Sequence, residues 1–319
     1  MTEEVFNLAS YFLDRHLEAG DGGRIAIVTR RAMYSYAQVA ERANRAAGVF
    51  RDLGVGREDR VLIALPDGVD AVAACLGAVR LGGLAVPVHA STRSKQLLTL
   101  LEDARPRVIV VDEAGLEQLR QVRERVRPDG LLVVGETAPA WSWRRRLNDV
   151  EPLTETAATA PRDAAFVLYT GRGSSGGRIF YRQQDLFELG DRLARAVSAR
   201  PDDRILCTAT LGAGYGLCAA LAVPFSTGAA AVLQSQPARP DALPQLIAHF
   251  RPTLVFSTPS TYQHLVERVT ALELASVREL VSAEEPLPEA LARNFPSRFG
   301  FDLMDASSHA TSPAMAWGV

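Results

Sequence analysis

Cysteine is scarce in this sequence, and no metal-binding arrangement of it occurs. The three cysteines among 319 residues are Cys75, Cys207 and Cys218, and none lies in a CxxC pair or at a cysteine–histidine spacing suited to zinc. Their neighbours are apolar. We therefore expect reduced core residues in a cytoplasmic protein, without a disulfide framework or a structural zinc site.

An excess of charge of one sign is also lacking. Lysine and arginine number 35 against 37 aspartates and glutamates, which gives a net charge of −2. Such a balance provides no broad basic surface for nucleic acid or an anionic membrane. The first residues, MTEEVFNLAS, lack the positive start and apolar run of a signal peptide. We expect neither nucleic acid nor membrane as a partner.

A convincing membrane-spanning segment is missing too. The uncharged stretch at residues 211–233 is interrupted by glycines and by Pro224 among small residues. A spanning helix needs about 20 predominantly apolar residues, and this composition favours a buried strand, loop and helix instead.

What the sequence does contain is a hydrophobic content of 47%, arranged in short Val-, Ile- and Leu-rich runs between longer amphipathic stretches. That alternation predicts an α/β fold with buried, mostly parallel strands. The predicted strands are residues 60–65, 84–88, 107–111, 131–134, 165–169, 204–208, 229–233, 253–256 and 279–282. The predicted helices are residues 36–53, 67–81, 92–103, 184–200, 217–225, 241–250, 259–270 and 288–295.

The elements fall into two similar sets. Residues 136–163 lose the periodicity and carry three prolines, so we interpret them as a surface connection. The predicted organisation is a first α/β subdomain at residues 1–163 and a second at residues 164–319, with mostly parallel sheets packed together. No internal sequence repeat is detectable.

A glycine-rich loop follows the predicted strand AFVLY at residues 165–169. The segment YTGRGSSGGR, residues 169–178, allows backbone N–H groups to converge on an anion, while hydroxyls and arginines add donors. It is neither a Walker A motif nor a GxGxxG dinucleotide motif, and the latter fact argues against a dinucleotide-binding oxidoreductase. A phosphate-binding loop and an ordinary exposed loop remain open on composition alone.

With its flanking segments, this loop resembles the phosphate loop of the adenylate-forming superfamily of AMP-forming acyl- and aryl-acid ligases. Further segments in the same order resemble that superfamily and its benzoate-CoA ligase-like members. They are YSYAQV at 34–39, GVGREDRV at 54–61, GGLAVPV at 82–88, LGAGYG at 211–216, PFSTGA at 224–229, VSAEEPLP at 281–288 and DLMDASS at 302–308. The resemblance covers essentially the whole chain.

The resemblance implies a site for ATP or AMP and for a small carboxylic acid. The implied nucleotide-binding residues are Thr170, Gly171, Gly173, Ser174, Ser175, Gly176, Arg178, Ser282, Ala283, Glu284, Asp305, Ala306, Ser307 and Thr311. The implied acid-binding residues are Tyr215, Gly216 and His309. A tyrosine beside a glycine suits the flat face of an aromatic acid, although a core tyrosine and a structural histidine remain alternatives.

Several positions depart from the family pattern. Arg178 stands where the family has its loop lysine, and Ile179 replaces a glycine. Thr311 or Ser312 stands where the family has a glutamate that helps to hold Mg²⁺, so a carboxylate ligand for that ion is missing. Glu284 stands where the family often has glycine beside the adenine, and its carboxylate would repel a nucleotide. Its alternative is a solvated pair with Glu285.

Two functions are therefore compatible with the sequence. One is an adenylation-domain-like pseudoenzyme that is impaired or inactive alone, since the family continues beyond this point into a C-terminal domain with a second catalytic lysine. The other is an active carboxylate-activating domain completed by that C-terminal domain. The implied acceptor is coenzyme A or a carrier protein, and no catalytic residue is assigned.

Overall fold

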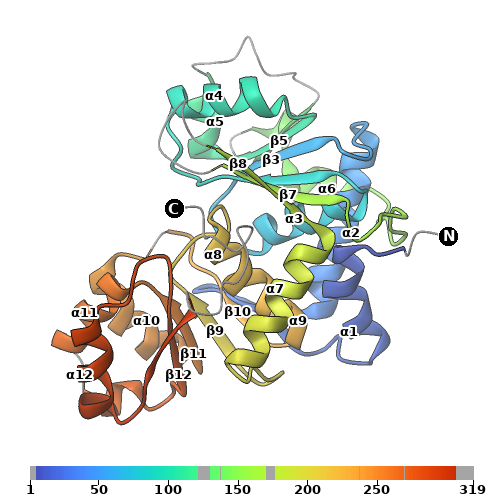
Figure 1. Cartoon of the computed structure of the whole chain (residues 1–319). Helices are drawn as coiled ribbons and strands as arrows, with labels where there is room; N and C mark the ends of the chain where they lie inside the picture. The colour runs from blue at the N-terminus through green and yellow to red at the C-terminus, as the bar shows by residue number, and fades with distance from the viewer. Residues whose placement is uncertain are drawn as a thin grey trace. The chain divides into compact units, whose positions relative to one another are not determined.

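The computed structural model describes residues 5–120, 130–136, 138–169, 177–236, 238–268 and 270–306, which form two compact units (Figure 1). The first unit comprises Met1–Arg24 and Tyr34–Phe187, and the second comprises Ile25–Met33 and Glu188–Val319. The expected boundary at residue 163 lies inside the first unit, because the strands that follow it join the first unit's sheet. No helix in the described part of the chain is long and apolar enough to cross a membrane.

The first unit is built on a six-stranded sheet with the order β6-β5-β3-β4-β7-β8. All neighbouring strands are parallel except β7 and β8, which pair antiparallel. The sequence analysis places no strand at β8, because only one of its five side chains is buried. The strands are β3 (Arg60–Ala64), β4 (Leu84–Pro87), β5 (Val108–Asp112), β6 (Leu131–Val134), β7 (Ala164–Tyr169) and β8 (Arg178–Arg182).

Helices connect these strands, and one of them, α6, lies in the stretch that we expected to be a plain connection. The helices are η1 (Ser10–Asp14), α1 (Arg15–Glu18), α2 (Tyr36–Asp52), α3 (Val69–Arg80), α4 (Ser94–Ala104), α5 (Glu113–Arg120), η4 (Pro139–Trp141) and α6 (Trp143–Asp149). Proline-rich flanks hide the short amphipathic period of α6, whose Trp143 and Leu147 are buried.

Helix α2 shows how local sequence sets the fold. Ser35 caps its first turn, since the Gln38 backbone N–H donates to the Ser35 hydroxyl at 3.3 Å and the Ser35 N–H donates to the Gln38 side chain at 2.9 Å. The helix then packs closely on α3. At Gly77 an added Cβ would lie 2.8 Å from the Ala46 Cβ and 3.0 Å from the Ala43 carbonyl oxygen, so only glycine allows this approach.

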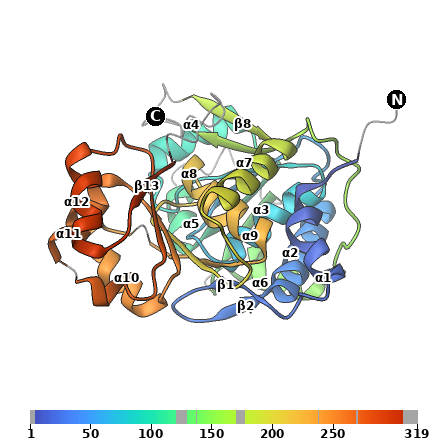
Figure 2. The same ribbon diagram turned by 60° about the horizontal axis from the view of Figure 1, so that its bottom comes forward.

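The second unit is built on a seven-stranded sheet with the order β13-β12-β11-β9-β10-β1-β2 (Figure 2). From β13 to β1 all printed pairings are parallel, which confirms the predicted mostly parallel sheets. Strands β1, β2 and β13 are not in the sequence prediction. The strands are β1 (Ile25–Val28), β2 (Met33–Ser35), β9 (Arg204–Cys207), β10 (Ala230–Val232), β11 (Leu254–Ser257), β12 (Glu279–Ser282) and β13 (Leu303–Asp305).

Helices α10, α11 and α12 lie together on one side of this sheet in both views (Figures 1 and 2). The helices after β8 are α7 (Gln183–Ala196), α8 (Gly214–Leu217), η5 (Cys218–Ala222), α9 (Val223–Thr227), η6 (Pro240–Ala242), α10 (Leu243–Phe250), α11 (Pro259–Arg268), η7 (Ala271–Leu274) and α12 (Glu289–Phe299). Residues 214–227 thus form one α–π–α run where the sequence predicts a shorter helix.

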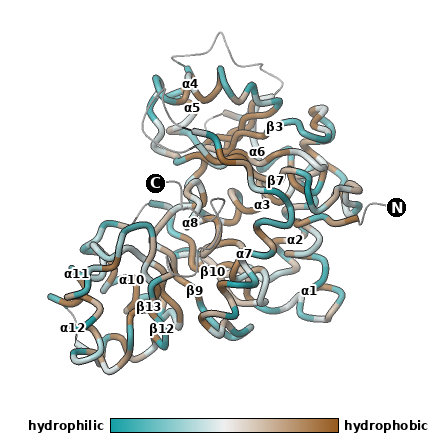
Figure 3. The backbone as a smooth tube through the Cα atoms, in the orientation of Figure 1, coloured by the Kyte–Doolittle hydropathy of each residue, from teal (hydrophilic) through white to brown (hydrophobic). Residues whose placement is uncertain are grey.

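The hydrophobic core of the second unit lies between the sheet and these three helices. Leu206, Val255, Leu280 and Leu303, one from each of four neighbouring strands, belong to one buried cluster. In Figure 3 the tube is brown along buried strands such as those near β3, whereas much of α7 is teal or white. The three cysteines are buried, as predicted.

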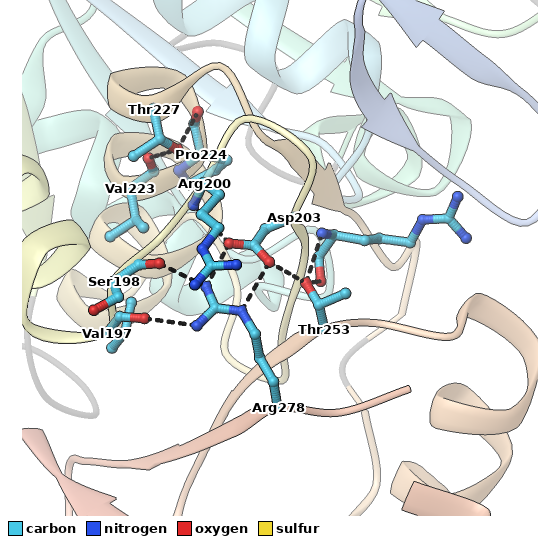
Figure 4. Close-up of polar contacts among 10 residues, drawn as sticks. Val197, Ser198, Arg200, Asp203, Val223, Pro224, Thr227, Thr253 and Arg278 are labelled. Atoms are coloured by element: carbon cyan, nitrogen blue, oxygen red, sulfur yellow. Dashed lines mark hydrogen bonds and ion pairs between the residues drawn. The ribbon is translucent and has the colours of Figure 1, made fainter. Parts of the chain in front are cut away.

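The amino ends of β9, β11 and β12 are joined by an ion pair between the buried Asp203 and the half-buried Arg278, which we call the amino-edge network (Figure 4). The Asp203 carboxylate accepts from Arg278 Nη2 at 2.6 Å, from the Thr253 hydroxyl at 2.7 Å and from the Arg200 backbone N–H at 2.6 Å. Burial would raise the pKa of Asp203, but the hydrogen bonds from Arg278, Thr253 and Arg200 outweigh it and hold the pKa below its usual value.

The Arg278 guanidinium also donates to two backbone carbonyls that follow α7. Its Nη1 reaches the Val197 oxygen at 3.1 Å, and its Nη2 reaches the Ser198 oxygen at 2.8 Å (Figure 4). Since both carbonyls directly follow the last turn of α7, Arg278 and Asp203 together link the end of α7 to the starts of β9, β11 and β12.

Candidate functional site

The carboxyl ends of four neighbouring strands in the second unit carry a line of polar side chains. In register, Ser257 of β11 faces Ser282 of β12, which faces Asp305 of β13. Thr208, which follows β9 directly, has its hydroxyl 2.7 Å from that of Ser257. We call these four residues the polar row.

The polar row lies on the face of the sheet that packs against α10, α11 and α12. Each of its members stands two residues after one of the four core residues Leu206, Val255, Leu280 and Leu303, and a step of two returns to the same face of a strand. In open parallel sheets, ligands bind outside the carboxyl ends of the strands. The row brings together two predicted site residues, Ser282 and Asp305, and adds two polar residues that sequence reasoning missed.

Ser282 and Ala283 are both fully buried. The Ala283 N–H donates to the Ser257 carbonyl oxygen at 3.1 Å and so extends the sheet by one bond. The Ser282 hydroxyl has no hydrogen-bond partner among the described residues. A buried hydroxyl without a partner costs free energy, so this position is not optimised for stability.

The two glutamates after Ala283 differ from each other. Glu285 is exposed, and its carboxylate accepts from the Ser260 N–H at 3.2 Å and from the Ser260 hydroxyl at 3.0 Å, which caps the start of α11. Glu284 is half-buried and has φ +69°, a left-handed conformation that favours glycine. Burial first, and the neighbouring Glu285 second, raise the pKa of Glu284. The interpretation as one solvated pair therefore holds only for Glu285.

Tyr215 lies in α8 and is fully buried. Its hydroxyl donates to the Val281 carbonyl oxygen at 3.1 Å, and its ring meets Phe256 edge-on at 6.2 Å. Burial is the main cause that raises its pKa well above the usual value. These contacts match the alternative of a core tyrosine, which ties α8 to β12.

Gly216 has a packing role. A Cβ at this position would overlap the carbonyl group of Thr210, so glycine is needed for the turn after β9 to fold back on α8. Tyr215 and Gly216 together fix the backbone of residues 208–216 beside the polar row.

Arg178 opens β8 in the first unit and pairs in register with Tyr169, the last residue of β7. Its Nη1 atom lies 3.1 Å from Asp103 Oδ2, and the Tyr169 hydroxyl donates to the same oxygen at 2.6 Å. Asp103 is a further residue that the sequence pattern did not single out, because it lies on a different element, α4.

Nine predicted site residues lie outside the described residues: Thr170, Gly171, Gly173, Ser174, Ser175, Gly176, Ser307, His309 and Thr311. Their roles stay predictions. Of the remaining predicted residues, Ala306 is buried directly after β13 and Asp305 is half-buried. The described residues contain no group of three or more His, Cys, Asp or Glu side chains that could hold a metal ion.

Comparison with known proteins decides the family. A family model described as AMP-binding enzyme matches residues 13–306. The chain belongs to this family. It is 29% identical over 313 residues to a 3-hydroxybenzoate–CoA/4-hydroxybenzoate–CoA ligase of Thauera aromatica, covering 95% of this chain and 59% of that protein. It is also 29% identical over 308 residues to a benzoate–CoA ligase of the same organism, covering 95% of this chain and 58% of that protein.

Among solved structures, a benzoate CoA ligase from Burkholderia xenovorans LB400 superposes with a TM-score of 0.85 at 25% identity. The match covers 94% of this chain and 60% of that one. The expected adenylate-forming fold is thus confirmed. This AMP-binding family member spans about three fifths of the length of the relatives it matches.

Two half-buried carboxylates lie at the carboxyl ends of neighbouring strands in the second unit: Asp305 ends the edge strand β13, and Glu284 follows β12 by two residues. In the first unit, Arg178 is already paired with Asp103.

Proposed function

We propose that this chain is an adenylation-type domain that takes a small aromatic carboxylic acid and, acting alone, activates it poorly with ATP. The observation that carries this proposal is Glu284. Its backbone has the left-handed conformation that glycine favours, while its side chain introduces a half-buried carboxylate.

An ionised Glu284 carboxylate would be an uncompensated charge at this strand end. No cation among the described residues lies within salt-bridge distance of Glu284, and burial already disfavours its ionised form. An anionic nucleotide brought to this strand end would add repulsion to that cost. Nucleotide binding is therefore expected to weaken as Glu284 ionises.

The acid class rests on the relatives, which are named as ligases of benzoate and hydroxybenzoates. Tyr215 and Gly216 fix the backbone of residues 208–216, and this segment resembles that of benzoate-CoA ligase-like proteins. The acceptor of the acyl group in this proposal is coenzyme A, as in the relatives' names, with a carrier protein as the other candidate. Mg²⁺ would be held weakly without the carboxylate that the family supplies near Thr311.

An efficient carboxylate-activating ligase, completed by a C-terminal domain, is the second candidate. The fold supports it, since the chain superposes on a benzoate CoA ligase with a TM-score of 0.85. This candidate requires that Glu284 be harmless to nucleotide binding.

The test compares the wild-type protein with Glu284→Gly and with Glu58→Gly, a control that relieves another glutamate of positive φ at +63° in the first unit. Binding of Mg-ATP and of benzoates is measured by shifts in melting temperature, and turnover by pyrophosphate release. We expect benzoates to bind all three proteins and Glu284→Gly to bind Mg-ATP roughly tenfold more tightly than the other two. Rapid benzoate-dependent pyrophosphate release by the wild type would favour the second candidate, and no binding of any benzoate would remove both.

A further inference from the structure

One carboxylate, that of Asp103, holds the two residues at the last paired position of the β7–β8 hairpin. It accepts the Tyr169 hydroxyl at 2.6 Å and lies 3.1 Å from Arg178 Nη1, both at the same oxygen, Oδ2. Strand β8 lies beside α4 in both views of the molecule (Figures 1 and 2). Among the described residues at this end of the hairpin, Arg178 is the only cation, and it is already paired with Asp103.

The position of Asp103 explains why it holds these donors. It lies in the last turn of α4, where the partial negative charge of the helix end disfavours a carboxylate. Cationic and hydroxyl donors offset this repulsion. Arg60 contributes as well, because its Nη1 donates to the carbonyl oxygens of Asp103 at 3.3 Å and Ala104 at 2.8 Å. Burial first, and the bond to Asp103 second, raise the pKa of Tyr169, which keeps its hydroxyl a donor.

We propose that Asp103 is a positioning residue that acts through Arg178. It holds the Arg178 guanidinium against α4 and so reduces the positive charge that is available to bind a polyphosphate. The proposal rests on the proposed function, and Arg178 stands where the family has its loop lysine. About 42% of the Arg178 side chain is exposed, so a phosphate chain can reach it, but only in competition with Asp103.

The experiment uses inorganic tripolyphosphate, which has no base and needs no acid substrate, so Glu284 has little influence on the result. Its dissociation constant is measured by calorimetry at low and high salt for the wild type and for Asp103→Asn, Arg178→Gln and their double variant. Glu117→Gln is the matched control, since it removes one carboxylate from an exposed ion pair with Arg120 in the same unit.

Asp103→Asn is expected to bind tripolyphosphate roughly three- to fivefold more tightly than the wild type at low salt, because an exposed ion pair is a modest competitor. The gain should shrink at high salt. It should vanish in the double variant, and Glu117→Gln should match the wild type. A purely structural role for Asp103 would not make the gain depend on Arg178.

The proposal is overturned if Asp103→Asn binds no more tightly than the wild type, or if the gain persists without Arg178. Should Asp103→Asn fail to fold, Asp103→Ser retains a hydrogen-bonding hydroxyl at this position and carries the same expectation. Failure of these outcomes is distinguishable from failure of the proposed function, which is tested by benzoate and Mg-ATP binding. A tripolyphosphate gain without any benzoate binding would keep Asp103 in its role and reject the acid.

Discussion

In the seven-stranded sheet, the amino ends and the carboxyl ends of the parallel strands differ in how well their polar groups are satisfied. We call them the amino edge and the carboxyl edge. At the amino edge, Asp203 lies between Arg278 and Thr253, and each charge faces an opposite charge or a donor. At the carboxyl edge, the Ser282 hydroxyl has no partner among the described residues, and Glu284 has a backbone conformation suited to glycine.

This difference between the two edges indicates that the polar groups of the amino edge stabilise the fold more than those of the carboxyl edge. A buried carboxylate is stable when several donors surround it and costly when none does. The pKa of Asp203 is held below its usual value, whereas that of Glu284 is raised. The two edges therefore respond to pH with opposite sign, and unoptimised groups at the carboxyl ends of strands are where a ligand site is expected.

The largest expected effect is at the amino edge. Asp203→Ala removes the partner of a partly buried guanidinium, and we expect the free energy of unfolding to fall by about 3 kcal/mol. Chemical denaturation at pH 7 measures this loss. Asp191→Ala, which breaks only an exposed pair with Arg195 in α7, serves as the control and should stay within about 0.5 kcal/mol of the wild type.

The pH dependence sharpens this prediction. Because the folded-state pKa of Asp203 is depressed, its contribution is present above the unfolded pKa and is lost as pH falls through the folded value. The wild type and Asp203→Ala should thus converge in stability in acid, below about pH 4. A difference that stays constant down to pH 3 would contradict an electrostatic origin.

Much of the fold is predicted by clear patterns in the sequence. Buried strands such as β3 and β12 are short apolar runs, and α2 is marked by its cap and its period. The elements that escape prediction lack such signals. Strand β8 has a single buried side chain, and the short strand β13 gains its place only by pairing with β12.

The next largest effect is expected at the carboxyl edge. Glu284→Gly should raise the free energy of unfolding by about 1 kcal/mol, because it relieves a left-handed glutamate and removes a half-buried charge. Since the pKa of Glu284 is raised, its charge destabilises the fold as pH rises through the folded value. The gain should therefore be larger at pH 7 than at pH 4.

Glu58→Gly separates the two causes of that gain. Glu58 is exposed and has φ +63°, so its replacement relieves backbone strain without removing a buried carboxylate. Its stabilisation should therefore measure the relief of backbone strain alone. If the gain of Glu284→Gly did not grow between pH 4 and pH 7, the charge at the carboxyl edge would have no energetic role.

The candidate site could be predicted only in part, because sequence reasoning works along one chain segment at a time. Motif order indicated Ser282, Asp305 and Arg178, but their partners come from other elements. Asp103 reaches Arg178 from α4, and Ser257 meets Ser282 across a strand pair. No single-sequence pattern reports such contacts between distant segments.

The smallest effect tests the polar row itself. Ser257→Ala removes a hydroxyl that is bonded to Thr208 at 2.7 Å and should cost about 1 kcal/mol of unfolding free energy. Ser282→Ala, one strand away, removes a buried hydroxyl without a partner among the described residues and should be neutral or slightly stabilising. Denaturation of the two variants side by side measures the contrast. Equal losses would mean that the Ser282 hydroxyl is bonded in solution, and the carboxyl edge would then be as well satisfied as the amino edge.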